Sequence, residues 1–192
     1  LMKRYLEGGY YDQHDNNAMT DLATKTIPET LEECVRFGKE VSLTTHQAMM
    51  GEERAGVLHM ILYGLKGVSA YADHAKILGK EDPAVYAEFY RLLSVYLDRE
   101  ISLEQLLSHA LEVGKLNYRV MELLMQANTE AYGHPIPTKV RITPVPGKAI
   151  LVSGHDLLDL EAILQQTEGK GIQVYTHGEM LPTHGYPGLK KY

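Results

Sequence analysis

The sequence predicts a mainly helical protein, in which a helical bundle is followed by the first β–α–β unit of a Rossmann-like α/β domain. Apolar residues recur at intervals of three and four through residues 51–124, which is typical of amphipathic helices that bury one face. A proline-rich break at residues 133–137 is followed by two apolar runs of strand length on either side of one more helical segment. We therefore expect a helical bundle domain at residues 1–134 and the truncated start of a Rossmann-like domain at residues 135–192.

The first part of the chain gives the weaker signals. Residues 1–28 are polar and mixed, so we expect a loose lead-in with one short helix. Pro28 and Glu29 suit the start of a helix, which we expect to end at Thr44 and Thr45.

Three longer helical patterns follow, and their short connections predict an antiparallel bundle. The first covers residues 51–79, where Gly79 suits the left-handed residue that ends a helix. Asp82 can cap the second helix, and Ser102 can cap the third with a glutamate or glutamine near the capping-box position. The residues expected to face the core are Val57, Met60, Ile61, Leu65, Val68 and Ala72, then Val85, Phe89, Leu92, Leu93 and Tyr96, and then Leu106, Leu107, Leu111, Leu116, Val120 and Leu124.

The C-terminal segment predicts a strand, a helix and a second strand. Residues 149–152 form a short apolar run that predicts a buried strand, and residues 172–175 predict another. The helix between them ends at Gly169 and Gly171, and a unit of this kind calls for parallel strands with a right-handed crossover. The residues expected to face inward from this helix are Leu157, Leu158, Leu160, Ile163 and Leu164.

Two parallel strands with one helix leave a sheet face and both edges uncovered, although parallel sheets are usually buried. Three arrangements would resolve this: the bundle covers the strands, a second copy pairs with them, or further strands belong to a longer chain. We favour the longer chain.

The composition excludes several kinds of site. Cys34 is the only cysteine among 192 residues, so neither an internal disulfide nor a site built from cysteines alone can form, and its apolar helical spacing predicts a small buried residue. A formal charge of −6 argues against nucleic acid or an anionic membrane as the main partner. Nucleotide-phosphate loops and the Glu-x-x-His pairs of di-iron bundles are absent from the sequence. We expect His59 and His74 to lie at the edge of the packed helical stripe.

Two metal-binding side chains follow the two predicted strands. His155 comes soon after the first strand, beyond Ser153, and Glu179 comes soon after the second. Ligands gather at the carboxyl ends of parallel strands, so we expect this imidazole and carboxylate at one rim, as ligands of iron or zinc. Two ligands do not complete a site, and the residues leave open a simpler interpretation in which the loop only caps a helix, with Asp156 as the capping residue.

Several sequence motifs resemble one known family. They are residues 150–157 (Ile-Leu-Val-Ser-Gly-His-Asp-Leu), 166–169 (Gln-Thr-Glu-Gly), 174–182 (Val-Tyr-Thr-His-Gly-Glu-Met-Leu-Pro), 184–187 (His-Gly-Tyr-Pro), 62–67 (Leu-Tyr-Gly-Leu-Lys-Gly) and 132–138 (Tyr-Gly-His-Pro-Ile-Pro-Thr). Over residues 51–192 the chain resembles the hybrid cluster proteins, also called prismane proteins or hydroxylamine reductases.

This resemblance implies two metal centres in a parent protein. One is an iron–sulfur cluster on N-terminal cysteines, and the other is a hybrid iron–sulfur–oxygen cluster held by a histidine, two glutamates and four cysteines. His155 corresponds to the histidine and Glu179 to the first glutamate. The implied activity is the reduction of hydroxylamine to ammonia, or of nitric oxide, in cytoplasmic defence against nitrosative stress, with electrons from a donor protein.

The departures from the family are as clear as the match. The remaining ligands would lie beyond Tyr192, the N-terminal cysteine motif is not present, and Cys34 matches no ligand. We therefore expect an internal fragment that is inactive and does not assemble a complete cluster.

Two alternatives remain open. The chain could be a non-enzymatic helical module that self-associates through its uncovered strands. His155 and Glu179, with His177 or His184, could also bind an adventitious zinc or iron ion. In each case we expect no nucleic-acid partner and no membrane association.

Overall fold

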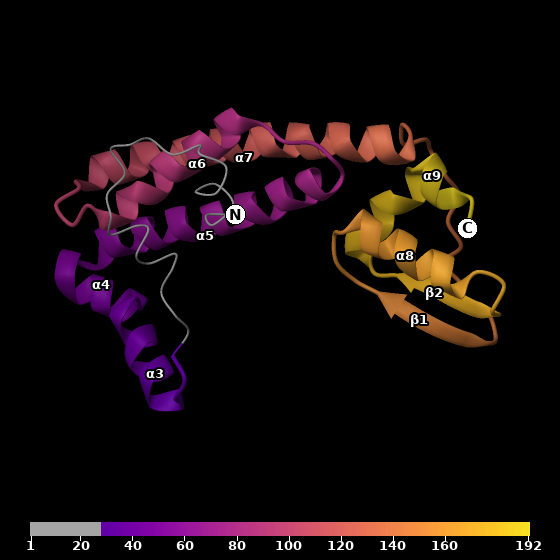
Figure 1. Cartoon of the computed structure of the whole chain (residues 1–192), viewed down its shortest axis with the longest axis horizontal. Helices are drawn as coiled ribbons and strands as arrows, with labels where there is room; N and C mark the ends of the chain where they lie inside the picture. Colours follow the sequence, from indigo (N-terminus) through magenta and orange to yellow (C-terminus); the bar gives the residue numbers. More distant parts are fainter. Residues whose placement is uncertain (1–27) are drawn as a thin grey trace. The chain divides into compact units, whose positions relative to one another are not determined.

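Helices dominate the part of the chain that the structure describes, residues 28–192 of a computed structural model (Figure 1). The prediction of a mainly helical protein is therefore confirmed, and the predicted lead-in lies outside the described residues. The elements are α3 (Leu31–Glu40), α4 (Leu43–Met50), α5 (Glu52–Ile77), α6 (Pro83–Ser94), η1 (Val95–Leu97), α7 (Leu103–Tyr132), β1 (Lys148–Val152), α8 (Leu157–Thr167), β2 (Ile172–Thr176), η2 (Gly178–Gly185) and α9 (Pro187–Lys190).

The chain divides into two compact units. Among the described residues, one contains residues 28–73 together with Glu81–Leu123, and the other contains His74–Lys80 together with Leu124–Tyr192. Within residues 28–192, none of the helices combines the length and apolar content that a membrane span requires.

The first predicted helix is two helices, α3 and α4. Ser42 begins α4, because its hydroxyl accepts a hydrogen bond from the backbone N–H of Thr45 at 3.3 Å. The prediction that helix ends at Thr44 and Thr45 is therefore wrong, since both residues lie in the first turn of α4.

Capping residues fix the ends of the long helices as predicted. Asp82 caps α6 by accepting from the N–H of Ala84 at 2.9 Å. At the start of α7, the Ser102 hydroxyl accepts from the N–H of Gln105 at 3.2 Å, and the Gln105 side chain accepts from the N–H of Ser102 at 2.9 Å. Gly79 follows α5 with φ of +84°, the left-handed conformation that glycine adopts at low cost.

Helices α6 and α7 run antiparallel, as two ion pairs between them show. Asp82 at the start of α6 pairs with Arg119, whereas Arg91 near its end pairs with Glu112. Residue numbers therefore rise along α6 where they fall along α7, as the predicted bundle requires.

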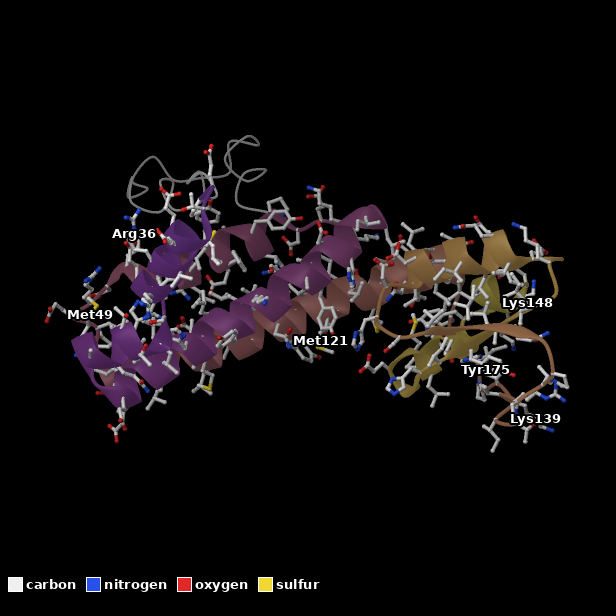
Figure 2. All side chains as sticks on the ribbon, turned by 90° about the horizontal axis from the view of Figure 1, so that it is seen from below. Arg36, Met49, Met121, Lys139, Lys148 and Tyr175 are labelled. Atoms are coloured by element: carbon white, nitrogen blue, oxygen red, sulfur yellow. The ribbon has the colours of Figure 1, made fainter. Side chains whose placement is uncertain are left out.

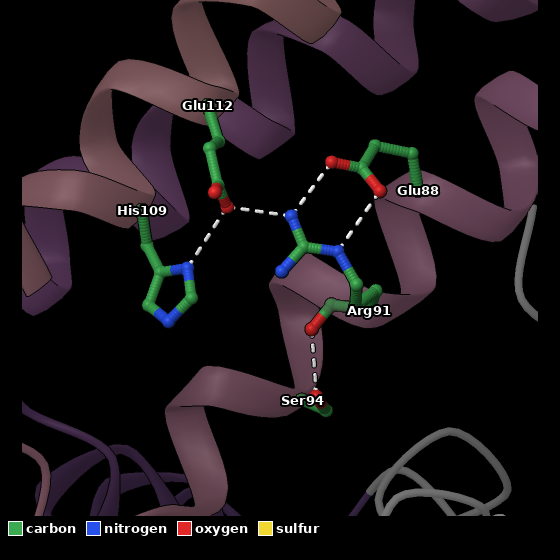
Figure 3. Close-up of polar contacts among 5 residues, drawn as sticks. All are labelled: Glu88, Arg91, Ser94, His109 and Glu112. Carbon is green, nitrogen blue, oxygen red and sulfur yellow. Dashed lines mark hydrogen bonds and ion pairs between the residues drawn. The ribbon is translucent and has the colours of Figure 1, made fainter. Parts of the chain in front are cut away.

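The Arg91 guanidinium lies between two carboxylates on the surface of α6 and α7 (Figure 3). It donates to Glu88 from two nitrogens, at 2.9 and 2.7 Å, and also to Glu112, which in turn contacts His109 at 3.0 Å. Hydrogen bonds from Arg91 lower the pKa of both carboxyl groups. Because the network is partly exposed to solvent, it aligns the helices more than it stabilises them.

Helices α5, α6 and α7 bury one apolar core within the first unit. The predicted core-facing residues are wrong at Met60, Leu107 and Leu111, which are 55%, 48% and 71% exposed. Leu58 and Val113 are buried instead. Each residue turns about 100° around a helix, so an apolar residue beside the buried stripe faces solvent although the overall spacing is correct. The buried members of this core are Leu58, Ile61, Leu65, Val68, Ala72, Val85, Phe89, Tyr90, Leu92, Val95, Ile101, Leu106, Val113, Leu116 and Val120.

In the second unit, β1 and β2 form a two-stranded parallel sheet with α8 between them in sequence. The register sets Lys148 opposite Ile172 and Val152 opposite Thr176. The predicted parallel pair is therefore confirmed.

Strand β1 is exposed rather than buried, contrary to the prediction. Ile150 is 38% and Leu151 is 72% exposed, because among the described residues only β2 pairs with this strand. On α8, Leu158 is 40% exposed and does not face inward as predicted, since it lies two positions from the buried Leu160. Tyr175 lies on β2 and is labelled in Figure 2. Its hydroxyl accepts a hydrogen bond from the N–H of Val145 at 2.8 Å.

The end of α7 and the start of α9 are packed tightly together in the second unit. A methyl group at Gly188 would lie 2.9 Å from the Cα of Tyr132, so only glycine fits there without a backbone shift. Nearby, the carbonyl of Gly185 accepts a hydrogen bond from the N–H of Ile136 at 2.9 Å. The core of this unit consists of Tyr132, Leu160, Met180 and Leu189.

Helices α5 and α7 approach each other closely at Gly64, which provides a test of this packing. A methyl group at Gly64 would lie 2.8 Å from Cγ1 of Val113, whereas a methyl group at Gly67 on the same helix would have no neighbour within 4 Å. Both positions are helical, so alanine offers each the same gain in helix propensity.

We predict that Gly67→Ala raises the free energy of unfolding by about 0.5–1 kcal/mol, whereas Gly64→Ala lowers it by about 1–3 kcal/mol through overpacking against Val113. Urea unfolding followed by circular dichroism measures both. Equal stabilisation by the two substitutions would show that α5 and α7 do not meet at Gly64.

Candidate metal site

The two strands end side by side at one edge of the sheet. Val152 and Thr176 are the last residues of β1 and β2 and are register partners. The loop that carries His155 and the η2 segment that carries Glu179 therefore both leave the sheet at the same rim, as parallel strands require.

A hydrogen bond joins the two segments. The hydroxyl of Ser153, the first residue after β1, donates to Oε2 of Glu179 at 3.2 Å. Ser153, His155 and Glu179 are all exposed, so their polar atoms are open to solvent.

The segment that carries Glu179 is held on both sides. Before it, the N–H of His177 donates to the carbonyl of Val152 at 2.8 Å, which extends the strand pairing by one residue. Beyond it, the ring Nε2 of His184 lies 2.7 Å from the hydroxyl of Thr176. Met180, next to Glu179, is only 2% exposed and anchors η2 in the core of the second unit.

The loop that carries His155 is fixed by the residue after it. Oδ1 of Asp156 accepts from the N–H groups of Leu158 and Asp159, at 2.8 and 3.1 Å, and so caps α8. Its other oxygen lies 3.8 Å from Nε2 of His74. Asp156 is thus the capping residue, as the simpler interpretation of the loop expected, and His155 is not used for that purpose.

Residues 11–192 match the Prismane/CO dehydrogenase family. The chain belongs to this family. The match extends the resemblance seen in residues 51–192 towards the N-terminus. It includes the motifs at residues 150–157 and 174–182, which carry Ser153, His155 and Glu179; the edge of the sheet where these three residues lie is called the strand-end rim.

Curated relatives carry the name hydroxylamine reductase. The chain is 56% identical over 170 residues to the hydroxylamine reductase of Syntrophobacter fumaroxidans, covering 88% of this chain and 31% of the relative. It is 52% identical over 164 residues to that of Thermodesulfovibrio yellowstonii and 49% identical over 163 residues to that of Actinobacillus succinogenes. Each of these two alignments covers 85% of this chain and 30% of the relative, so the chain spans about a third of its relatives' length.

The donor set at the rim fits the prismane family's metal chemistry in part. His155 offers nitrogen and Glu179 offers oxygen, and the described unit that contains them has no cysteine to offer sulfur. The chain's only cysteine, Cys34, belongs to the other compact unit. Among residues 28–192, no three His, Cys, Asp or Glu side chains are arranged to hold a metal ion. His155 and Glu179 therefore remain predicted ligands, and so do the alternatives His177 and His184.

Cys34 is exposed, contrary to the prediction of a buried residue. Helix α3 buries none of its residues, so an apolar position on it is not a core position. The Cys34 sulfur lies 3.7 Å from the carbonyl oxygen of Pro28.

The first unit contains a chain of polar contacts that the sequence did not predict. Nδ1 of His46 lies 2.8 Å from Nε2 of His59, and Nε2 of His46 lies 3.3 Å from the Tyr96 hydroxyl. His59 is 7% exposed and thus buried, rather than at the edge of the stripe as predicted. Tyr96 and His59 meet opposite nitrogens of His46, so the three groups do not converge on one point as metal ligands would.

Burial lowers the pKa of both histidines below the ordinary value of 6.5, with a further contribution at His46 from the charge on His59. The short contact requires one ring nitrogen to donate and the other to accept, so the contact cannot last when both rings are fully protonated. The unfolded chain therefore takes up protons before the folded protein does as the pH falls below 6.5.

We predict that the protein has a lower free energy of unfolding at about pH 5.5 than at about pH 7.5, because stability from this pair is complete only above the unfolded pKa. Urea unfolding at both pH values measures the difference. His59→Gln can keep a hydrogen bond but cannot be protonated, so the difference should shrink in this variant. An unchanged pH dependence in His59→Gln would show that other groups cause it.

Proposed function

We propose that this chain is part of a hybrid cluster protein that reduces hydroxylamine, and that His155 and Glu179 supply its first nitrogen and oxygen ligands. The observation that supports this most is the pairing of the two strand ends. There Ser153, which precedes His155 by two residues, forms a hydrogen bond with Glu179. The Rossmann-like character of this β–α–β unit is part of the same proposal.

The ligand types suit the proposed cofactor. A neutral imidazole and a carboxylate are harder ligands than thiolates, and mixed ligation of this kind leaves an iron site accessible to a small molecule with a nitrogen–oxygen bond. When bound, the hybrid iron–sulfur–oxygen cluster supplies the two electrons that, with two protons, convert hydroxylamine to ammonia and water. The exposure of both side chains leaves this rim open for cysteine ligands from elsewhere in the full-length protein.

Further parts of the proposal rest on the family resemblance. They are the second iron–sulfur cluster, an electron-donor protein as partner, activity on nitric oxide and a cytoplasmic location. The 192-residue chain alone should be inactive, because one cysteine cannot supply the sulfur ligands that the cluster needs.

We predict that His155→Ala or Glu179→Ala, made in the full-length protein, lowers the rate of hydroxylamine reduction roughly 100-fold or more. Mutation of residues that only hold metal ligands in place already costs about 10–100-fold in metal affinity or activity, and loss of a ligand should cost more. Oxidation of reduced methyl viologen by hydroxylamine measures the rate. Circular dichroism should show unchanged helix content, because both residues lie outside the helical bundle.

Matched controls are His134→Ala and Glu168→Ala, which remove an exposed imidazole and an exposed carboxylate outside the strand-end rim. Both should retain the wild-type rate. Wild-type rates in His155→Ala and Glu179→Ala would contradict the ligand assignment.

A second candidate function is self-association as a non-enzymatic module. The exposed Leu151 on β1 favours it, because an apolar strand with an uncovered edge pairs readily with another chain. Sedimentation velocity of the 192-residue chain tests the idea, and a single monomeric species at micromolar concentration would contradict it.

A further inference from the structure

We propose that Ser153 is a positioning residue, whose hydroxyl holds the Glu179 carboxylate at the end of β1 for metal binding. This inference rests on the proposed function, because it concerns the predicted ligand Glu179. The inference gives Ser153 a role beside the predicted ligands His155 and Glu179. Ser153 would contact the Glu179 side chain and not the metal itself.

The contact itself is the first support. Ser153 Oγ lies 3.2 Å from Oε2 of Glu179, and among residues 28–192 it is the one hydrogen-bond partner of this side chain. An exposed glutamate otherwise samples several rotamers, and that freedom is lost when the carboxylate binds a metal. A hydrogen bond that already restrains the carboxylate reduces this loss and leaves Oε1 available.

The backbone around Ser153 gives the hydroxyl a fixed starting point. Val152, the preceding residue, is register-paired with Thr176, and its carbonyl accepts the N–H of His177. Gly154, the following residue, has φ of +125°, a conformation that residues with a side chain rarely adopt. Asp156 then fixes the loop to the start of α8. Ser153 thus lies between two restrained points of the chain.

The other hydroxyl groups near the end of β2 are already engaged. The Thr176 hydroxyl contacts Nε2 of His184, and the Thr183 hydroxyl donates to the carbonyl of Met180. Ser153 is therefore the hydroxyl in this part of the described chain that serves Glu179. Residues that hold metal ligands in place commonly change metal affinity by 10–100-fold when mutated.

The test is calorimetric titration of the 192-residue chain with Zn²⁺, which takes the same nitrogen and oxygen donors as iron and needs no assembled cluster. We expect Ser153→Ala to weaken the Zn²⁺ binding that depends on Glu179 about tenfold, at the low end of such effects because the site is exposed. Ser153→Thr keeps the hydroxyl and should remain within about twofold of wild type. Glu179→Ala and His155→Ala define the Zn²⁺ binding that belongs to this rim.

Glu168→Ala removes an exposed carboxylate at the other end of α8 and controls for the loss of one negative charge. Thermal unfolding of every variant confirms that each remains folded. Wild-type Zn²⁺ affinity in Ser153→Ala, alongside a loss in Glu179→Ala, would overturn the role of Ser153 and leave the proposed function intact.

Two further results would also overturn the inference. If Ser153→Thr binds as weakly as Ser153→Ala, the hydroxyl is not what matters. If Glu179→Ala binds Zn²⁺ as wild type does, the carboxylate is no ligand in this chain, and the assignment of Glu179 in the proposed function fails with it.

Discussion

The parallel register of β1 and β2 is the constraint on which the rest of the candidate site depends. Because Val152 lies opposite Thr176, the chain leaves both strands at the same edge of the sheet. An antiparallel pair would deliver His155 and Glu179 to opposite edges, and a shift by one residue would turn every side chain of β1 to the other face. The bond from His177 to Val152 continues the pairing into the segment that carries Glu179. The contact between Ser153 and Glu179 follows from this geometry.

The sequence predicted the ends of the long helices better than it predicted burial. Asp82, Ser102 and Gly79 act through neighbours within a few residues, so their effects are visible in the local sequence. Met60 and Leu151 are apolar residues in correctly predicted elements, yet both are exposed. Whether an apolar face is covered depends on elements distant in the chain, and spacing alone does not show which neighbours exist.

The candidate site shows the same division between local and distant information. The order of strand, helix and strand, together with the family motifs, was sufficient to predict that His155 and Glu179 follow neighbouring strands. The bond from Ser153 to Glu179 joins residues 26 positions apart and depends on side-chain conformation, which spacing does not encode. His46 was missed for a related reason, since its partner His59 lies on another helix and neither residue belongs to a recognisable motif.

The close packing of Gly188 against Tyr132 has a mechanical consequence. Gly188 at the start of α9 lies against the backbone of Tyr132 at the end of α7, and Ile136, soon after α7, donates its N–H to Gly185 at the end of η2. No side chain separates these backbones at Gly188, so nothing compressible lies between them at that point. Any movement of the end of α7 would therefore displace the start of α9 directly, because no flexible side chain lies between the two backbones to absorb it.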